Sequence, residues 1–192
     1  MRKAALSGML SLLFLFSCSE QKEGNRNLYF SSALCMQNEI RHLQEGDFFL
    51  LKEITYKGKK ELIQVNKPDW EKELKPFVDA DISLPGLTHA YEVDSALIAD
   101  TSSGKTVRCT VRHYTAKEKK TAVQKLSVWQ WENGNTRLSV ELKKSNSWFS
   151  LEQRMDYTSG TGYTITGKQK MTIGDPAGYN ISARFMKNNS TP

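Results

Sequence analysis

The sequence predicts an α+β fold: a curved antiparallel β-sheet of about six to nine strands, shaped like half a barrel, with two N-terminal helices packed on one face. Two helical stretches precede most of the sheet, and from His89 onward the apolar residues recur with a period of two. The later strands are joined by short turns, which leave no room for a long crossover. Consecutive strands should therefore form a meander in which neighbours pair antiparallel.

The first predicted helix carries one apolar stripe. Its members recur at spacings of four, three, four and three residues: Tyr29, Ala33, Met36, Ile40 and Leu43. Gly46 supplies a C-terminal stop. The opposite face lacks the basic residues that membrane-surface helices favour, so we expect the stripe to pack against the sheet.

A hairpin and a second helix come next. Residues 48–56 and 61–65 flank a turn, KGKK, and are expected to be strands. The stretch PDWEKEL at 68–74 opens the helix, since proline and acidic residues suit a first turn. The apolar residues of this helix share one face: Trp70, Leu74, Phe77 and Val78. Pro76 should end or kink the helix near Lys75.

Alternation along the later strands predicts which side chains point to the inner, concave face of the sheet. In the strand at 107–113 these are the odd-numbered residues, which include Cys109 and His113.

The last two turns predict a register. Tyr157 should face Tyr163, Met155 should face Ile165 and Gln153 should face Gly167. Beyond the final turn, Ile173 should face Tyr179 and Met171 should face Ile181. Gly167, in mid-strand, is expected to let the sheet bend.

The first residues have the pattern of an export signal. Arg2 and Lys3 precede an apolar run from Leu6 to Phe16. Because a membrane span needs about 20 apolar residues, this run is too short to cross a bilayer and fits a secretory signal. It ends in LFSC, which resembles the lipobox of bacterial lipoproteins. The resemblance implies that residues 1–17 are removed and that Cys18 carries the lipid anchor; the alternatives are a plain signal peptide and a buried helix with an incidental cysteine.

The rest of the predicted organisation follows from this cleavage. Residues 18–27 contain the lipidated cysteine and a polar tether, residues 28–187 form a single α+β domain, and residues 188–192 form a disordered tail. Ser19 stands where many inner-membrane lipoproteins carry an aspartate, which implies the outer membrane. The polar and acidic run after Cys18 resembles the surface-export signals of Bacteroidota lipoproteins, so either face of that membrane remains open.

Features along residues 29–185 resemble a group of uncharacterised Bacteroidota lipoproteins. They are YF at the start, the YKGKKE hairpin, DWEKELKPFVDADI, YEVDS and YTITGKQKM. The predicted architecture also resembles lipoprotein carriers of the LolA/LolB type, in which an incomplete barrel capped by helices holds acyl chains. Fold analogy of this kind implies a ligand-binding role without a motif that specifies it.

Composition and motifs argue against several classes of function. The net charge is +6, and +4 once Arg2 and Lys3 are removed, with lysines scattered over turns rather than gathered in a stripe. We therefore expect no nucleic-acid partner. The three histidines lack metal-ligand spacing, so no metal or other cofactor is expected. No nucleophile, phosphate-loop or dinucleotide motif occurs, which favours a protein that is not an enzyme.

The candidate ligand site lies on the apolar face of the last strands. Two glutamines interrupt that face, and buried amides need hydrogen-bond partners. They can line a cavity or be satisfied within a packed core. In the first case the cavity-lining residues are Gln153, Gln169, Tyr157, Tyr163, Met155 and Met171.

Three further positions are candidates for covalent chemistry. Cys35 and Cys109 can form a disulfide in an oxidising envelope or remain separate thiols. Asp94-Ser95-Ala96 resembles the short motif that Bacteroidota use for O-glycosylation, which makes Ser95 a candidate acceptor. The alternative is an ordinary strand serine.

Two functions are consistent with these observations. The first is an outer-membrane lipoprotein that binds an apolar or amphipathic ligand, or a partner protein, through the concave face. The second is a structural or accessory subunit of an envelope complex without a small ligand. A cavity between helices and sheet would favour the first, and exposed tryptophans around a filled core would favour a protein partner.

Overall fold

The computed structural model describes residues 29–100 and 106–188, with the side chain of Asp100 left out. The predicted signal peptide, Cys18, the tether and residues 189–192 lie outside the described residues. The described part contains two α-helices, one 3-10 turn and nine strands. Their bounds are α1 Ser32–Glu45, β1 Phe48–Tyr56, β2 Lys59–Val65, α2 Trp70–Val78, η1 Pro85–Leu87, β3 Tyr91–Asp100, β4 Val107–Ala116, β5 Val123–Trp131, β6 Thr136–Ser145, β7 Phe149–Thr158, β8 Gly162–Met171 and β9 Ala177–Lys187.

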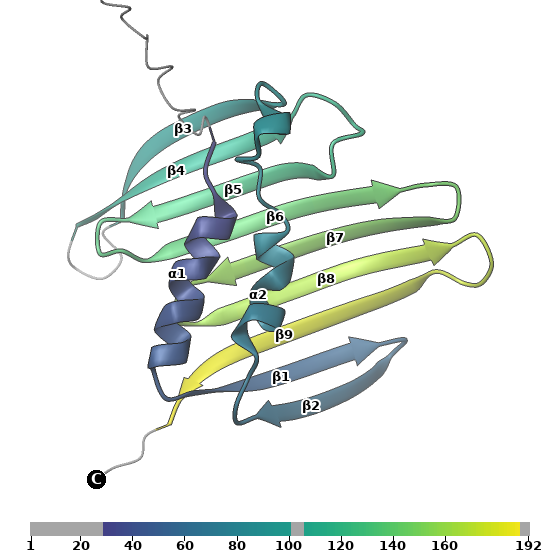
Figure 1. Cartoon of the computed structure of the whole chain (residues 1–192), viewed down its shortest axis with the longest axis horizontal. Coiled ribbons are helices and arrows are strands. Elements are labelled where there is room, and N and C mark those ends of the chain that lie inside the picture. The colour runs from purple at the N-terminus through teal and green to yellow at the C-terminus, as the bar shows by residue number, and fades with distance from the viewer. Residues whose placement is uncertain (1–28, 101–105, 189–192) are drawn as a thin grey trace, which may run out of the picture.

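All nine strands belong to one open antiparallel sheet in the order β2-β1-β9-β8-β7-β6-β5-β4-β3, which confirms the predicted α+β class. Strands β3 to β9 pair in chain order, as a meander requires. The N-terminal hairpin joins the other end, because β1 pairs with β9 along its whole length, from Phe48↔Lys187 to Tyr56↔Tyr179. In Figure 1 the purple-blue β1 therefore lies beside the yellow β9.

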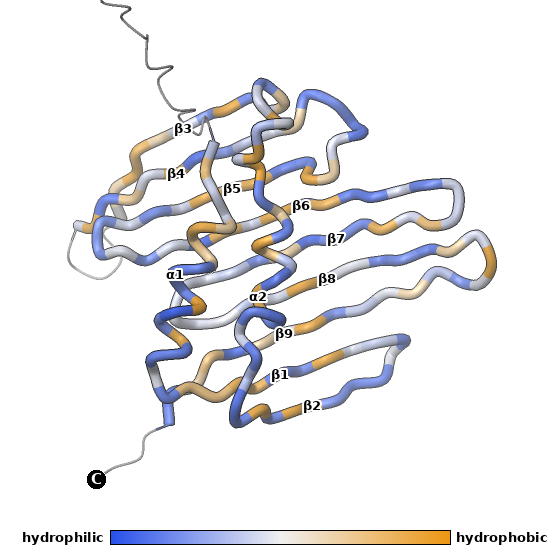
Figure 2. The backbone as a smooth tube through the Cα atoms, in the orientation of Figure 1, coloured by the Kyte–Doolittle hydropathy of each residue, from blue (hydrophilic) through white to orange (hydrophobic). Residues whose placement is uncertain are grey.

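Both helices lie on the same face of the sheet, here called the inner face (Figure 1). Their apolar stripes are buried: Met36 and Leu43 from α1, and Trp70, Leu74 and Phe77 from α2. The strands supply alternate residues to the same core, which produces the alternating apolar and polar colours along each strand in Figure 2. This core is the main source of stability, since burial of a large apolar side chain contributes about 1.5–3 kcal/mol.

The predicted register is confirmed for one turn and wrong for the next. Strands β7 and β8 pair as expected, with Tyr157↔Tyr163, Met155↔Ile165 and Gln153↔Gly167. Between β8 and β9, however, Tyr179 pairs with Gly167 and Ile181 pairs with Ile165. Strand β8 ends at Met171, so that Ile173 lies in the turn instead of opposite Tyr179. The error is an even number of residues, so the same side chains still share the inner face.

Pro76 does not end α2 near Lys75. The helix continues to Val78, and the N–H of Asp79 still donates to the carbonyl oxygen of Lys75 at 2.8 Å. A proline this close to the C-terminus of the helix removes only one backbone hydrogen-bond donor. The complete burial of Phe77 favours continuation of the helix. The start agrees with the sequence pattern, with Asp69 as the N-cap acceptor for Lys72.

Cys109 and His113 were expected to point inward, and both expectations are wrong. Tyr114 pairs with Leu126 in the core, so alternation turns Cys109 and His113 to the outer face. There Cys109 lies opposite Trp131 in the register and is fully buried, whereas His113 is exposed and lies 2.8 Å from Ser127 (Nδ1 to Oγ). Both faces of the sheet are apolar at this point, so a period of two could not indicate which face was inside.

Candidate functional site

The six predicted cavity-lining residues share the inner face but do not enclose one cavity. Met155, Tyr157 and Tyr163 are at most 5% exposed and belong to the core beneath the helices. Farther along the same strands, Gln153 is half-buried, and Gln169 and Met171 are exposed. The side chains pass from core to solvent because the helices cover only the part of the inner face nearer the β7–β8 turn (Figure 1).

The uncovered part of the inner face, here called the open half, consists of residues from three neighbouring strands. Two register pairs, Phe149↔Met171 and Leu151↔Gln169, continue the inner face beyond the core. Strand β9 adds Tyr179, and the members of the open half are Phe149, Leu151, Gln153, Gln169, Met171, Tyr179 and Ile181. Most of them are apolar and half-buried, with Met171 47% exposed. The open half is thus an apolar floor with two amide groups on it. The Nε2 of Gln169 contacts Sδ of Met171 at 3.4 Å.

Two exposed apolar side chains lie in the turns at this end of the sheet. Trp148 in the β6–β7 turn is 72% exposed, and Ile173 in the β8–β9 turn is 89% exposed. The two turns are joined because both the N–H and the Oγ1 of Thr172 donate to the carbonyl oxygen of Trp148, each at 2.9 Å. Lys144 pairs with Leu151 and brings an exposed cation to the same face. The apolar floor and the neighbouring cation together can hold a molecule with an apolar chain and an anionic head.

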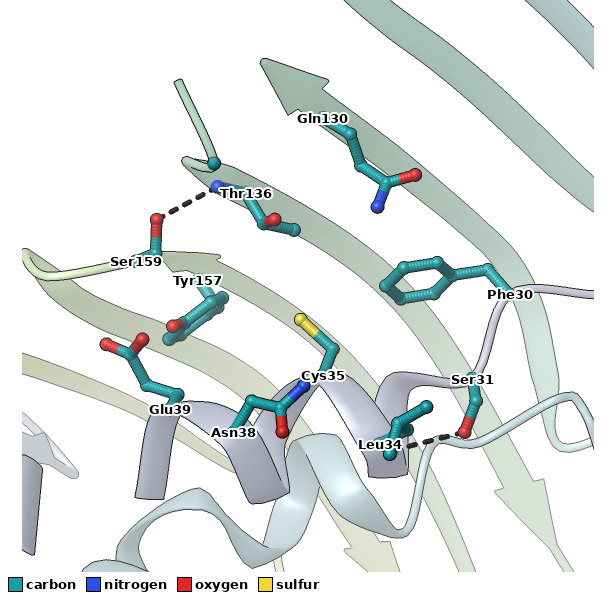
Figure 3. A pocket seen from close by; sticks show the side chains of 11 residues that line it. Phe30, Ser31, Leu34, Cys35, Asn38, Glu39, Gln130, Thr136, Tyr157 and Ser159 are labelled. Carbon is teal, nitrogen blue, oxygen red and sulfur yellow. Dashed lines mark hydrogen bonds between the residues drawn. The ribbon is translucent and has the colours of Figure 1, made fainter. Parts of the chain in front are cut away.

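A separate pocket lies between α1 and the ends of β5, β6 and β7, with a volume of about 380 Å³ (Figure 3). One side of the pocket is mainly apolar, with Phe30 just before α1 and Leu34 in its first turn. The other side is polar and comes from both the helix and the sheet. The lining residues are Phe30, Ser31, Leu34, Cys35, Asn38, Glu39, Gln130, Gly134, Thr136, Tyr157 and Ser159.

The hydroxyl group of Tyr157 is the most unusual polar group in this pocket. The side chain is 1% exposed, and its Oη lies beside the Glu39 carboxylate but makes no hydrogen bond that meets normal distance and angle limits with the described residues. Burial and the nearby Glu39 carboxylate raise the pKa of Tyr157 far above its ordinary value, so the hydroxyl remains protonated. Glu39 itself is held by the sheet, since its Oε1 accepts a hydrogen bond from the N–H of Gly160 at 2.9 Å.

Cys35 points into the same pocket (Figure 3). Burial, together with the Glu39 carboxylate, raises the pKa of the thiol to about 11. The thiolate is the reactive form of cysteine, so Cys35 is a poor nucleophile at neutral pH. Cys35 and Cys109 are not joined by a disulfide. The reason is topological: Cys35 lies on the helix that covers the inner face, whereas Cys109 faces outward.

A second cluster of polar groups fastens α2 to the sheet. The Oε2 of Glu73 accepts from Lys52 Nζ and from the hydroxyl of Tyr163, each at 2.5 Å. Both charged side chains are largely buried, and the pKa of Tyr163 is raised by burial and by the Glu73 carboxylate. Each group in the cluster has a partner, so we interpret it as structural.

The remaining candidates are less informative. Ser95 lies exposed on β3, the edge strand, where a modifying enzyme can reach it. Within residues 29–100 and 106–188, no three His, Cys, Asp or Glu side chains are placed to hold a metal ion. The same ranges contain no helix that is both long and apolar enough to cross a membrane.

The sequence pattern does not predict the pocket beneath α1, apart from Tyr157. Its lining comes from the start of the domain and α1, and from the strand ends and turns of β5–β7, about 100 and 125 residues farther along the chain. Residues such as Asn38, Glu39 and Gln130 look like ordinary solvent-facing polar residues in the sequence. Only the packing of α1 across β5–β7 brings them together, so no local signal could have found them.

Comparison of the chain with protein-family models, with curated proteins and with solved structures finds no match.

Proposed function

We propose that this protein is a lipid-anchored protein of the bacterial outer membrane that binds an apolar or amphipathic molecule on the open half of its inner face. It acts as a binding protein rather than an enzyme. The observation that carries the proposal is the apolar floor that the helices leave uncovered, where Phe149 and Leu151 are half-buried and Met171 is 47% exposed. Exposed apolar patches of this kind mark sites of interaction with ligands or partners.

The chemistry of the site suits an amphipathic ligand with an anionic head. An acyl chain can pack along Phe149, Leu151 and Tyr179, which are half-buried even without it. Each CH₂ group that the site removes from water contributes about 0.8 kcal/mol. Lys144 lies at the border of the apolar floor, where its ammonium group can pair with a carboxylate or phosphate.

The anchor is tested by intact mass spectrometry of the full chain purified from membranes. We expect the mature protein to begin at Cys18 and to carry covalent acyl chains, because of the LFSC sequence at 15–18. Cys18→Ser should remain an unprocessed precursor. A wild-type chain that is processed elsewhere, or that carries no lipid, would contradict the lipoprotein proposal.

Binding is tested by native mass spectrometry of the same membrane-extracted protein. We expect a non-covalent adduct of lipid mass on the wild type, in addition to the covalent anchor. The variant Met171→Glu should lose the adduct, since a carboxylate would enter the apolar site. Lys170→Glu is the matched control, because residue 170 adjoins Met171 but faces outward. A wild-type protein with no adduct would overturn the proposal.

The alternative function, an accessory subunit of an envelope complex, is favoured by the edge strand β3. Val93, Leu97 and Ile98 are 50%, 68% and 45% exposed on this ten-residue edge. The other edge, β2, begins with two exposed lysines, which discourage pairing with another chain. An apolar edge such as β3 can accept a strand from a partner. If so, Leu97→Lys should abolish a high-mass species of this protein on native gels of membrane extracts.

A further inference from the structure

We propose that the pocket beneath α1 is a second binding site, separate from the open half, and that it takes a saccharide. The pocket contains a buried and unpartnered hydroxyl, a carboxylate, amide groups and an apolar wall within about 380 Å³. This volume falls within the range of about 300–1,000 Å³ that small-molecule sites occupy. Some donors and acceptors of the lining groups are already engaged within the protein. Those that are left determine the chemical class of the ligand.

The Tyr157 hydroxyl and the Glu39 carboxylate together are best matched by a hydroxyl group on the ligand. Figure 3 shows the two side chains next to each other on the wall of the pocket. One carboxylate oxygen of Glu39 accepts from Gly160, which leaves Oε2 as an acceptor for the ligand. The phenolic hydroxyl of Tyr157 can both donate and accept. A ligand hydroxyl can donate to Glu39 and accept from Tyr157 at the same time, whereas an ether or ketone oxygen can only accept.

The remaining polar groups offer mainly donors. Arg112 donates to the Oε1 of Gln130 at 2.6 Å, so the amide oxygen is engaged and the amide NH₂ is available (Figure 3). The Oγ of Ser159 accepts from the N–H of Thr136 at 2.9 Å, which leaves the Ser159 hydroxyl hydrogen as a donor. Such donors fit the oxygen atoms of a polyhydroxylated ring.

The apolar wall fits the other surface of a sugar. A pyranose ring has a C–H face and a rim of hydroxyl groups, and the C–H face packs on aromatic and aliphatic side chains. Phe30 supplies an aromatic ring on this wall, and Leu34 is 59% exposed at the pocket. A bound sugar would cover Leu34 and would give the Tyr157 hydroxyl the partner that the fold itself does not provide.

The proposal is tested by saturation-transfer NMR with the full-length chain in a detergent that has no sugar headgroup. The probes are glucose, galactose, mannose and N-acetylglucosamine, together with maltose and lactose. We expect saturable binding of at least one probe. Tyr157→Phe, which removes one hydroxyl and keeps the ring, should weaken that binding about tenfold. Asn38→Ala, at an exposed position of α1, should also weaken it.

Tyr56→Phe is the matched control, because it makes the same change at an exposed position of β1 outside both sites and should leave sugar binding unaltered. Loss of a buried, unpartnered hydroxyl should leave the melting temperature of Tyr157→Phe equal to or above that of the wild type, so weaker binding would not reflect misfolding. The proposal is overturned if no probe binds, or if Tyr157→Phe binds as well as the wild type. Lipid binding at the open half, measured by native mass spectrometry, does not depend on the outcome of the sugar experiment, so the two proposals can fail separately.

Discussion

At the scale of single residues, Gly167 shows how one position selects the pairing of two strands. The ring of Tyr179 on β9 occupies the space that a side chain at Gly167 would fill: a Cβ there would lie 2.4 Å from both Cζ and Oη of Tyr179. This contact covers the glycine in mid-strand and fixes the Gly167↔Tyr179 pair. Aromatic cover of a strand glycine is a known way to specify register.

Gly167→Ala should therefore lower the free energy of unfolding by about 1–3 kcal/mol, because Tyr179 must move to make room. Urea denaturation measures the change. Gly178→Ala is the control, since a Cβ at that neighbouring strand position would meet nothing closer than 3.9 Å and should cost little. Equal effects of the two substitutions would show that the Tyr179 contact is unimportant.

The buried Glu73 carboxylate is the second residue whose role can be measured. Glu73→Gln would leave the ammonium group of Lys52, 17% exposed, without its counter-charge. We expect a loss of about 1–3 kcal/mol in the free energy of unfolding, from the unpaired buried charge and the weaker bond to Tyr163.

Glu53→Gln provides the comparison for Glu73. The Glu53–Lys60 pair also joins two side chains, at 2.8 Å, but it is 37% and 63% exposed. Exposed pairs contribute about 0–1 kcal/mol. A cost for Glu73→Gln no larger than that of Glu53→Gln would contradict the assignment of a structural role to the cluster.

At the scale of elements, the N-terminus of α1 is held by one serine with two roles. The Oγ of Ser31 accepts from the N–H of Leu34 at 3.2 Å and donates to Asp81 at 3.0 Å. It therefore caps the helix and connects it to the segment after α2. Since α1 forms one wall of the pocket, this cap also positions the candidate sugar site.

Ser31→Ala should lower the free energy of unfolding by about 1–2 kcal/mol, the usual value of an N-cap. Ser83→Ala is a suitable control because Ser83 also donates to Asp81, at 3.0 Å, without capping a helix. We expect a smaller loss for Ser83→Ala in thermal denaturation. If the two variants melt at the same temperature, the cap does not contribute as described.

Local elements could be predicted because their signals are local. The helical stripe through Met36 and Leu43 and the turns around Gly160 each lie within a few residues. The pairing of β1 with β9 joins segments about 130 residues apart, and nothing within either strand indicates its partner. The site was predicted only in part for the same reason: the sequence indicates that Tyr157 and Gln169 share a face, but not where the helices stop covering it.

At the scale of the whole molecule, several ionisable groups are kept neutral by the packing of helices on the sheet. Burial raises the pKa of Cys35 to about 11 and that of Tyr91 to about 12. Tyr157 and Tyr163 shift in the same direction. In the unfolded chain these groups lose their protons from about pH 9 for cysteine and pH 10 for tyrosine. The folded state binds more protons above these values, so its stability must decline as pH rises.

We therefore expect the free energy of unfolding to be constant up to about pH 9 and to fall steadily between pH 9 and pH 12. Urea titrations at pH 8, 9, 10 and 11 measure this. Cys35→Ser should lose less stability than the wild type between pH 9 and pH 11, because it lacks the thiol that titrates there. Stability that stays unchanged to pH 11 would contradict the burial of these groups.

The central claim is that the open half of the inner face binds an amphipathic molecule, and photo-crosslinking in cells tests it most directly. A photoreactive amino acid is placed at residue 171 or, as control, at residue 170, which is also exposed but faces outward. The full-length protein is irradiated in intact cells, and the mass of the adduct is measured. We predict an adduct of lipid mass at position 171 and none at position 170. An adduct of protein mass at position 171, or no adduct there, would contradict the claim.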